Sequence, residues 1–329
     1  MIDSGWVPAQ ILFGYAPPLV EWRPTGTQAF THPFMGETFR LCEQAHPFPF
    51  RVHMRTSMEA LRQVAEASPT LSPCGFIFHL SRCGSTALSR ALASDPANRV
   101  LSEPNVLGNV LGARQWVPSL EVREQQAWLR DTVAVLGRPL AGEQRYFIKF
   151  NSWAVCFLPM FRRLYPDVPW IFMFRHPLEI LMSHRKEAAV FMLSHFPAAL
   201  LGMKPSSQNM SDEEHQARVL ASLGLAVLDA LERDPGKVML MDYAEMPAAV
   251  LERVFPFFGL PQDAATAARL NATLRVHAKT PQHVFEADSA RRQAMASPAL
   301  RHAAERWVTP VYHALCQARH ARLASPCSS

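Results

Sequence analysis

The chain has 329 residues, of which 49% are hydrophobic and 19% are charged. This composition supplies a full-sized core and excludes a disordered protein, a collagen-like repeat and a small disulfide-stapled scaffold. The formal net charge is +5, without a run of four basic residues, so nothing concentrates positive charge as a nucleic-acid-binding protein does. A dispersed excess of arginine suits an anionic small ligand.

The six cysteines are scattered and form no Cys-x-x-Cys pair, which indicates neither a disulfide framework nor a structural zinc site. The apolar stretch 188–203 is interrupted by His195 and Pro197 and is too short to span a bilayer. The first residues lack the basic flank and apolar run of a secretory signal. We expect a cytoplasmic protein without a membrane span.

Residues 1–70 are rich in aromatic residues and proline, with a short helical pattern at 58–67. Such a segment packs irregularly against a domain more often than it folds alone. We therefore predict an N-terminal extension, residues 1–70, packed on an α/β domain of residues 71–329.

From residue 74 onward, short apolar runs alternate with helical periodicity. Strands are predicted at 76–80, before Glu103, and at 146–150, 170–174 and 237–241. Helices are predicted at 85–94, after Ser211, after Pro247 and at 300–318. Apolar strands separated by helices predict a doubly wound, mainly parallel sheet with helices on both faces.

The turn after the first of these strands, Ser81-Arg-Cys-Gly-Ser-Thr86, leads directly into a helix. Backbone N–H groups and the positive end of a helix dipole meet there, which is typical of a phosphate cradle. Arg82 adds a cation that binds phosphoryl or sulfuryl oxygens, and Ser85 and Thr86 add hydroxyl donors. An ordinary strand-to-helix turn remains the alternative. A nucleoside triphosphate with magnesium is disfavoured, because the first glycine and the lysine of a Walker loop are missing.

A second candidate anion site follows the strand at 170–174. Arg175 stands where this strand ends, and the carboxyl edge of a doubly wound sheet is where ligands bind. Ser183, eight residues later, is placed to share a phosphate with Arg175. The alternative is a solvated arginine and a serine on a helix surface.

Together these two sites resemble the sulfotransferases that use 3′-phosphoadenosine 5′-phosphosulfate (PAPS), in the style of bacterial and tyrosylprotein members. The resemblance implies a P-loop-like sulfotransferase fold. It also implies that Arg175 and Ser183 bind the 3′-phosphate. The residues that it assigns to the 5′-phosphosulfate loop are Arg82, Cys83, Gly84, Ser85 and Thr86.

Further segments resemble the family in the right order. The strand at 237–241 leads to Tyr243, which the resemblance implies as an adenine contact, although Ala244 replaces the carboxylate that follows in the family motif. The segment 257–261 resembles the family's Phe-Leu-Gly-Leu. The basic signature of cytosolic members near the C-terminus is absent. The candidates to complete the 3′-phosphate site in its place are Lys279, Arg291 and Arg292.

Two residues are candidates for the chemistry itself. An acceptor hydroxyl or amine needs a base as its bond forms, and Glu103 resembles the post-loop glutamate that serves tyrosylprotein sulfotransferases as base. A surface glutamate before a proline is the alternative. Lys149 ends a buried strand, where lysines are unusual unless they reach a polar site. It matches a family lysine that assists the sulfuryl group, whereas the family's catalytic histidine falls on Asn151, which is no base.

Other residues near these motifs receive weaker interpretations. Cys83 lies at a helix start that lowers the pKa of a thiol, which leaves a nucleophile or an oxidation-sensitive thiol open. The histidines nearby, among them His184, are interpreted as structural. Residues 188–210 form part of an acceptor pocket or a lid, or else a core helix.

The predicted function is sulfuryl transfer from PAPS to a hydroxyl or amine of a small-molecule or carrier-bound acceptor. Adenosine 3′,5′-bisphosphate is the expected product, and no metal, nucleic acid or membrane span is expected. A P-loop kinase acting on a small molecule and a non-catalytic nucleotide-binding module are the alternatives. The sequence specifies neither the acceptor nor the oligomeric state.

Overall fold

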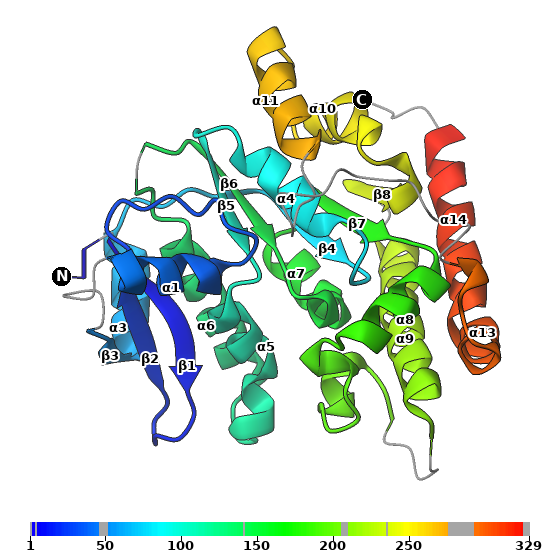
Figure 1. The fold of residues 1–329 in the computed structure, drawn as a ribbon. Coiled ribbons are helices and arrows are strands. Elements are labelled where there is room, and N and C mark those ends of the chain that lie inside the picture. Colours follow the sequence, from blue (N-terminus) through cyan, green and yellow to red (C-terminus); the bar gives the residue numbers. More distant parts are fainter. Residues whose placement is uncertain are drawn as a thin grey trace.

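A five-stranded parallel sheet forms the centre of the structure, a computed structural model (Figure 1). The strand order is β5-β6-β4-β7-β8, and each pair of neighbours is parallel. The strands are β4 (Pro73–His79), β5 (Asn98–Ser102), β6 (Arg145–Lys149), β7 (Trp170–Phe174) and β8 (Val238–Asp242). The structure describes residues 2, 3, 5–45, 52–140, 142–204, 210–234, 236–275 and 293–324.

Helices cover both faces of this sheet, so the doubly wound prediction is confirmed. Successive side chains of a strand point to opposite faces, and in β4 Phe78 packs into one apolar cluster whereas Ile77 packs into the other. The face of Ile77 is covered by α4 (Ser85–Ala93), α10 (Phe255–Phe257) and α11 (Ala264–Arg275). The opposite face is covered by α5 (Asn105–Trp116), α6 (Val122–Leu136), α7 (Leu158–Leu164), α8 (Pro177–Lys186), α9 (Asp212–Arg233), α13 (Pro298–Ala303) and α14 (Thr309–Ala324).

The strand order makes β4 the strand at which the chain changes direction across the sheet. From β4 the chain crosses to β5 at one edge, returns through β6, and then passes to β7 on the other side of β4. In open α/β sheets, ligands bind outside the carboxyl ends of the strands at such a switch point. The segments that follow β4, β5, β6 and β7 meet at this edge, and they carry the candidate residues.

The N-terminal segment forms a small antiparallel sheet, where we expected irregular packing. Its strands are β1 (Trp6–Leu12), β2 (Leu19–Pro24) and β3 (Met54–Ser57), with helices α1 (Met35–Ala45) and α3 (Met58–Ala67). Alternate residues of β1, such as Val7 and Ile11, are buried in the same cluster as residues of α5 and α6. Arg138 donates a hydrogen bond of 3.0 Å to the carbonyl of Ile2. The boundary at residue 70 stays a prediction.

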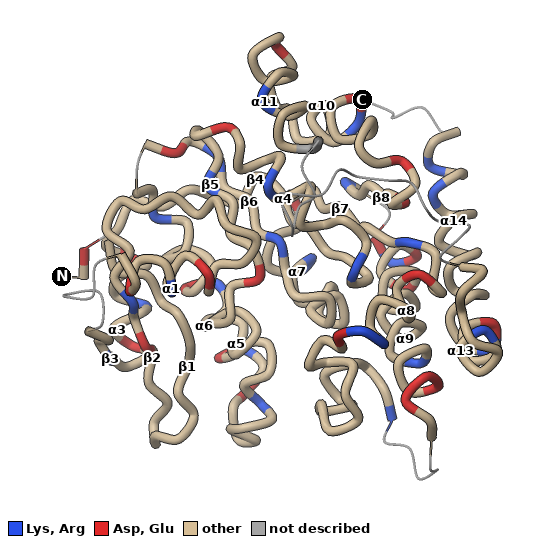
Figure 2. Tube along the Cα trace, in the orientation of Figure 1, with Lys and Arg blue, Asp and Glu red and all other residues tan. Residues whose placement is uncertain are grey.

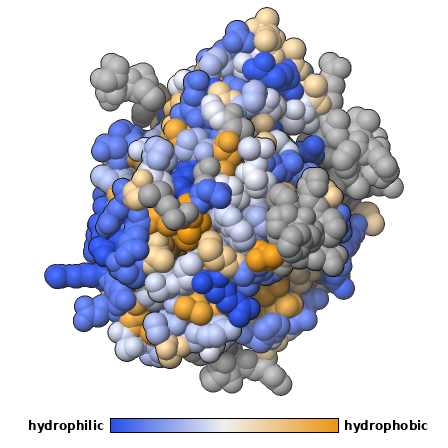
Figure 3. Space-filling view, turned by 90° about the vertical axis from the view of Figure 1, so that its left-hand side faces the viewer, coloured by the Kyte–Doolittle hydropathy of each residue, from blue (hydrophilic) through white to orange (hydrophobic). Residues whose placement is uncertain are grey.

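Charges and apolar side chains are dispersed over the surface. Figure 2 shows Lys and Arg segments interspersed with Asp and Glu along the trace. On the face drawn in Figure 3, the coloured apolar residues form separate spots among hydrophilic ones. The most exposed tryptophan, Trp116, stacks on Phe13 with ring centroids 6.1 Å apart. None of the helices in the described part of the chain is long and apolar enough to cross a membrane.

Candidate functional site

The turn between β4 and α4 has a backbone shaped to bind an anion. Ser81, Arg82 and Gly84 have φ angles of 67°, 47° and 82°, all in the left-handed region. Left-handed residues next to a helix start turn successive N–H groups toward one point, and the first N–H groups of α4 lie free of helical acceptors. This backbone conformation is compatible with the phosphate cradle that the sequence predicts, which stays a prediction. Ser85 and Thr86 are buried at the beginning of α4.

Backbone strain is concentrated at this edge of the sheet. The described residues include four non-glycine residues with positive φ, and Ser81, Arg82 and Glu103 are three of them. A non-glycine residue in this region costs about 1–3 kcal/mol and persists where the surroundings hold it, which occurs often at functional sites. The strain therefore marks the ends of β4 and β5 as a candidate site independently of any motif.

Gly84 is required by its surroundings as well as by its backbone. A Cβ atom at this position would lie 2.8 Å from two ring carbons of Tyr243, closer than real Cβ contacts. The ring of Tyr243, which follows β8, therefore lies directly on the turn. The resemblance assigned Tyr243 to the adenine, and the structure puts its ring against the proposed phosphate loop.

Arg82 is directed along the carboxyl edge toward the end of α8. Its Nη2 donates to the carbonyl of Glu187 at 2.8 Å and lies 3.3 Å from the Glu187 carboxylate. The Arg82 side chain is 19% exposed, whereas that of Glu187 is 82% exposed. A pair with so exposed a partner is weak, so an incoming anion can replace Glu187.

The expectation of a reactive thiol at Cys83 is wrong. Cys83 is fully buried, and its Sγ donates to the carbonyl of Met173 at 3.2 Å. Burial raises the pKa of this thiol to about 12. The side chain lies in the apolar cluster of the sheet, and burial outweighs the backbone hydrogen bond from Ser85 at the start of α4, which by itself lowers the pKa of this thiol. Cys83 can contribute only its backbone to the loop.

Arg175 brings the two candidate anion sites into contact. Its Nη1 lies 3.4 Å from the carbonyl oxygen of Arg82, and its guanidinium carbon lies 4.0 Å from the ring centroid of Tyr243. Its Nε donates to Glu179 at 2.7 Å, and its Nη2 binds the same carboxylate oxygen. The end of β7 and the turn after β4 are therefore in direct contact.

Glu179 is a residue of this site that the sequence reasoning missed. Its side chain is only 3% exposed, and Gln293 donates to its second oxygen at 3.0 Å. The available signal was the spacing of four residues from Arg175, which brings side chains together on a helix. A buried carboxylate here neutralises Arg175, so a phosphate must compete with it for the guanidinium.

Ser183 lies in α8, four residues beyond Glu179 and on the same face of the helix, and is half-buried. The remaining candidates for the 3′-phosphate, Lys279, Arg291 and Arg292, lie outside the described residues.

Glu103 and Lys149 form a buried ion pair beside the turn. Lys149 is the last residue of β6, and its ammonium binds Glu103 Oε1 directly. The Lys149 side chain is 1% exposed and that of Glu103 is 23% exposed. The Glu103 N–H also donates to the Lys149 carbonyl at 2.7 Å, and the Phe34 ring centroid lies 5.3 Å from Lys149 Nζ.

The electrostatics of this pair decide what Glu103 can do. Burial alone raises the pKa of the Glu103 carboxyl, but the Lys149 ammonium and contact with His79 outweigh burial and hold the pKa at about 2. A base is most effective when its pKa is near the working pH.

The segment 188–203 contains two 3-10 helices, Val190–Met192 and Ala198–Leu201. The interpretation of this segment as a core helix is therefore wrong, because Pro197 and Gly202 break the helical run. Between the two turns, Phe196 packs on Trp153 with ring centroids 5.8 Å apart.

The described residues contain no group of three or more His, Cys, Asp or Glu side chains able to hold a metal ion.

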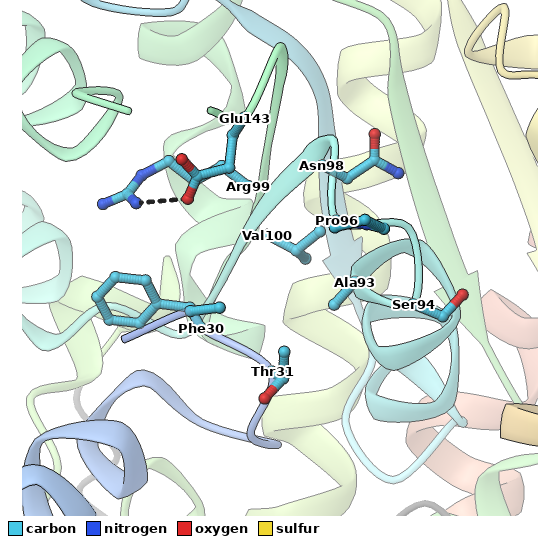
Figure 4. Close-up of a pocket in the computed structure, with 10 residues that line it drawn as sticks. Phe30, Thr31, Ala93, Ser94, Pro96, Asn98, Arg99, Val100 and Glu143 are labelled. Carbon is cyan, nitrogen blue, oxygen red and sulfur yellow. Dashed lines mark hydrogen bonds and ion pairs between the residues drawn. The ribbon is translucent and has the colours of Figure 1, made fainter. Parts of the chain in front are cut away.

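A cavity of about 280 Å³ lies at the opposite end of the sheet (Figure 4). It is lined by Phe30, by Asn98 and Arg99 at the beginning of β5, and by Glu143. Arg99 is fully paired there, with 2.6 Å from its Nε to the Leu136 carbonyl and 3.3 Å to Glu143. This cavity is far from the strained turn and holds none of the candidate residues.

Comparisons with known proteins give structural neighbours only. No family model matches the chain, and no curated protein matches it. The structural neighbours are sulfotransferases. STF9 from Mycobacterium avium is 16% identical with a TM-score of 0.49, over 85% of this chain and 80% of that one.

Two further sulfotransferases have similar values. The sulfotransferase domain from the curacin biosynthetic pathway is 18% identical with a TM-score of 0.45, over 72% of this chain and 98% of that one. Mouse SULT7A1, in complex with PAP, is 12% identical with a TM-score of 0.41, over 85% of this chain and 99% of that one. Similarity at this level assigns no activity by itself.

Proposed function

We propose that this protein transfers a sulfuryl group from PAPS to a hydroxyl or amine of a small-molecule or carrier-bound acceptor. The observation that carries the proposal is the contact between Arg175 and the backbone of Arg82. It joins a left-handed anion-binding turn and a second arginine into one site at the carboxyl edge of the sheet. The Glu103–Lys149 pair lies at the same edge, because Lys149 ends β6 and Glu103 follows β5, the strand beside it.

Some groups of this site can bind a doubly phosphorylated adenosine as they stand. Others must first release a partner within the protein. The amides of the turn and Arg82 are suited to the 5′ end, because the carboxylate that pairs with Arg82 is exposed and its other partner, the Glu187 carbonyl, is neutral. Arg175, with Ser183, is suited to the 3′-phosphate, which must then share the guanidinium with Glu179. The ring of Tyr243 lies against both Gly84 and the Arg175 guanidinium, which makes it suited to contact the adenosine.

The chemistry asks for two things from the protein. PAPS supplies the activated sulfuryl group, whose S–O bond to the 5′-phosphate breaks as a hydroxyl acceptor forms a new S–O bond or an amine acceptor a new S–N bond. Glu103 takes the proton that the acceptor releases. The amides of the turn, Arg82 and Lys149 stabilise the negative charge on the leaving phosphate and on the sulfuryl oxygens. Negative charge next to Lys149 also strengthens Glu103 as a base.

A thermal-shift screen tests the proposal. We expect adenosine 3′,5′-bisphosphate to raise the melting temperature, and ATP with or without magnesium to raise it less. Arg175→Ala should lose this stabilisation. Arg233→Ala, at an exposed i,i+4 pair on α9, is the matched control and should keep it. A preference for magnesium-ATP would contradict the proposal and favour a kinase.

A further inference from the structure

His79 ends β4 and is only 4% exposed. Its Nε2 lies 3.0 Å from the Phe150 carbonyl, and its Nδ1 lies 3.2 Å from both the Ser81 amide nitrogen and the Ser152 hydroxyl. A carbonyl only accepts and an amide N–H only donates, so Nε2 carries the proton and Nδ1 the lone pair. The hydrogen bonds fix one neutral tautomer.

This tautomer supports the strained part of the anion-binding turn. The lone pair of His79 Nδ1 accepts the N–H of Ser81, whose φ of 67° is unfavourable for a residue with a side chain. On the other side, His184 Nδ1 accepts the Ala189 N–H at 3.3 Å, so its Nε2–H donates to Ser81 Oγ at 3.1 Å. Ser81 is thus held between two imidazoles.

The other side of the His79 ring faces the proposed base. Its Nε2 lies 3.5 Å from Glu103 Oε1, the same oxygen that binds the Lys149 ammonium. Burial, and then the charge of Lys149, lower the pKa of His79 and keep the ring neutral. A protonated ring would lose the lone pair that Ser81 needs. One rigid ring therefore touches the anion loop with one nitrogen and the base with the other.

We propose that His79 is a positioning residue of this site, which holds the anion-binding turn through Nδ1 and the Glu103 carboxylate through Nε2. The inference rests on the proposed function, because it links Nδ1 to the binding of PAPS and Nε2 to the proton transfer by Glu103. It adds a residue that the motif resemblance did not assign a role.

Two substitutions at His79 test the contributions of Nδ1 and Nε2 separately. In His79→Asn the amide oxygen replaces Nδ1 as acceptor for Ser81, but nothing reaches Phe150 or Glu103. In His79→Gln the amide nitrogen reaches toward these groups, but nothing replaces Nδ1. We expect His79→Asn to keep the Kd for adenosine 3′,5′-bisphosphate within about threefold while kcat falls about tenfold, and His79→Gln to weaken that Kd about tenfold.

The control is Thr132→Ala, which removes a buried hydrogen bond of 2.7 Å to Trp128 in α6 and should change neither quantity. Calorimetry gives Kd, and turnover with PAPS gives kcat. Equal losses in the two His79 variants, or no loss in either, would overturn the inference. Failure of the unsubstituted protein to bind the bisphosphate would overturn the proposed function itself, and the inference with it.

Ring-nitrogen NMR of the unsubstituted protein keeps the inference testable if a variant does not fold. We expect the Nε2–H tautomer of His79, and a shift of its Nδ1 signal when the bisphosphate binds. Bisphosphate binding that shifts the Gly84 amide but leaves both His79 nitrogens unchanged would contradict the role, as would the opposite tautomer.

Discussion

The two ends of the sheet each carry an arginine that is paired with a buried carboxylate and covered by an aromatic ring; Arg99 is buried and Arg175 is half-buried. At the amino end, Arg99 binds Glu143, and the Phe30 ring centroid lies 5.0 Å from its guanidinium (Figure 4). At the carboxyl end, Arg175 binds Glu179, and the Tyr243 ring lies at 4.0 Å. The composition of the two clusters is almost the same.

The backbone around the two clusters differs. The cluster at the carboxyl end adjoins Ser81 and Arg82, which have left-handed backbones, and Arg175 contacts the second of them. No described non-glycine residue around Arg99 has positive φ, and the Arg99 side chain is 1% exposed against 13% for Arg175. The two ends therefore differ in backbone strain and in access to the arginine, and strain of this kind occurs often at functional sites.

The largest effect is expected when one carboxylate at each end of the sheet is replaced by its amide. Glu103→Gln should lower turnover about 10²–10⁴-fold, because the amide cannot take the acceptor proton, while bisphosphate binding is retained. Glu143→Gln should leave turnover unchanged, since its carboxylate pairs with Arg99 and accepts from the Leu140 N–H at the opposite end of the sheet. Turnover with PAPS and calorimetry measure both. Near-normal turnover of Glu103→Gln would remove Glu103 from the mechanism, and binding without turnover in the unsubstituted protein would favour a non-catalytic module.

The two arginines should separate stability from binding. Arg99→Met leaves Glu143 buried without its cation and should lower the free energy of unfolding by about 3–5 kcal/mol, with bisphosphate affinity unchanged. Arg175→Met should also destabilise, because Glu179 is buried, and should weaken bisphosphate binding about 10–100-fold. Urea unfolding and calorimetry distinguish the two. A loss of bisphosphate affinity in Arg99→Met would contradict the expectation that Arg99 contributes to stability alone.

Two glycines with the same φ angle provide a further test of the difference between the two ends of the sheet. Gly84 and Gly142 both have φ of 82°, but a Cβ at Gly142 meets nothing within 4 Å. An alanine in this conformation costs about 1–2 kcal/mol, so Gly142→Ala should lose this much in urea unfolding and Gly84→Ala at least as much. Only Gly84→Ala must also displace the Tyr243 ring, so only it should weaken bisphosphate binding. Equal affinities in the two variants would mean that the ring is not part of the site.

The sheet and most of the edge were predictable because their signals are local in sequence. Apolar runs such as 170–174 predict buried strands, and the residue after each strand lies at the carboxyl edge by topology. Arg175, Glu103 and Lys149 were placed at strand ends in this way, and the family resemblance supplied the roles expected of them. The antiparallel strands β1–β3 were missed, because proline and aromatic residues obscured the alternation that buries Val7 and Ile11.

The partners of the site residues were not predictable, because they depend on contacts between distant segments. Nothing in the sequence links His79 to Phe150 and Glu103, or aims Cys83 into the core. The same limit applies to Tyr243, whose ring reaches the turn from β8. A sequence motif supplies residue types at an edge, whereas the direction of each side chain is decided by packing.

The smallest expected effect is the pH dependence of stability that Glu103 contributes. Its pKa is about 2 in the folded chain against an ordinary value of 4.5, so it stabilises the fold above pH 4.5, and this contribution is lost as the pH falls toward 2. The difference in unfolding free energy between the unsubstituted protein and Glu103→Gln should therefore shrink between pH 5 and about pH 3. Urea unfolding at each pH measures it. A difference that does not change with pH would mean that Lys149 does not hold Glu103 as an ion pair in solution, and the carboxyl edge would then lose the electrostatic property that distinguishes its base.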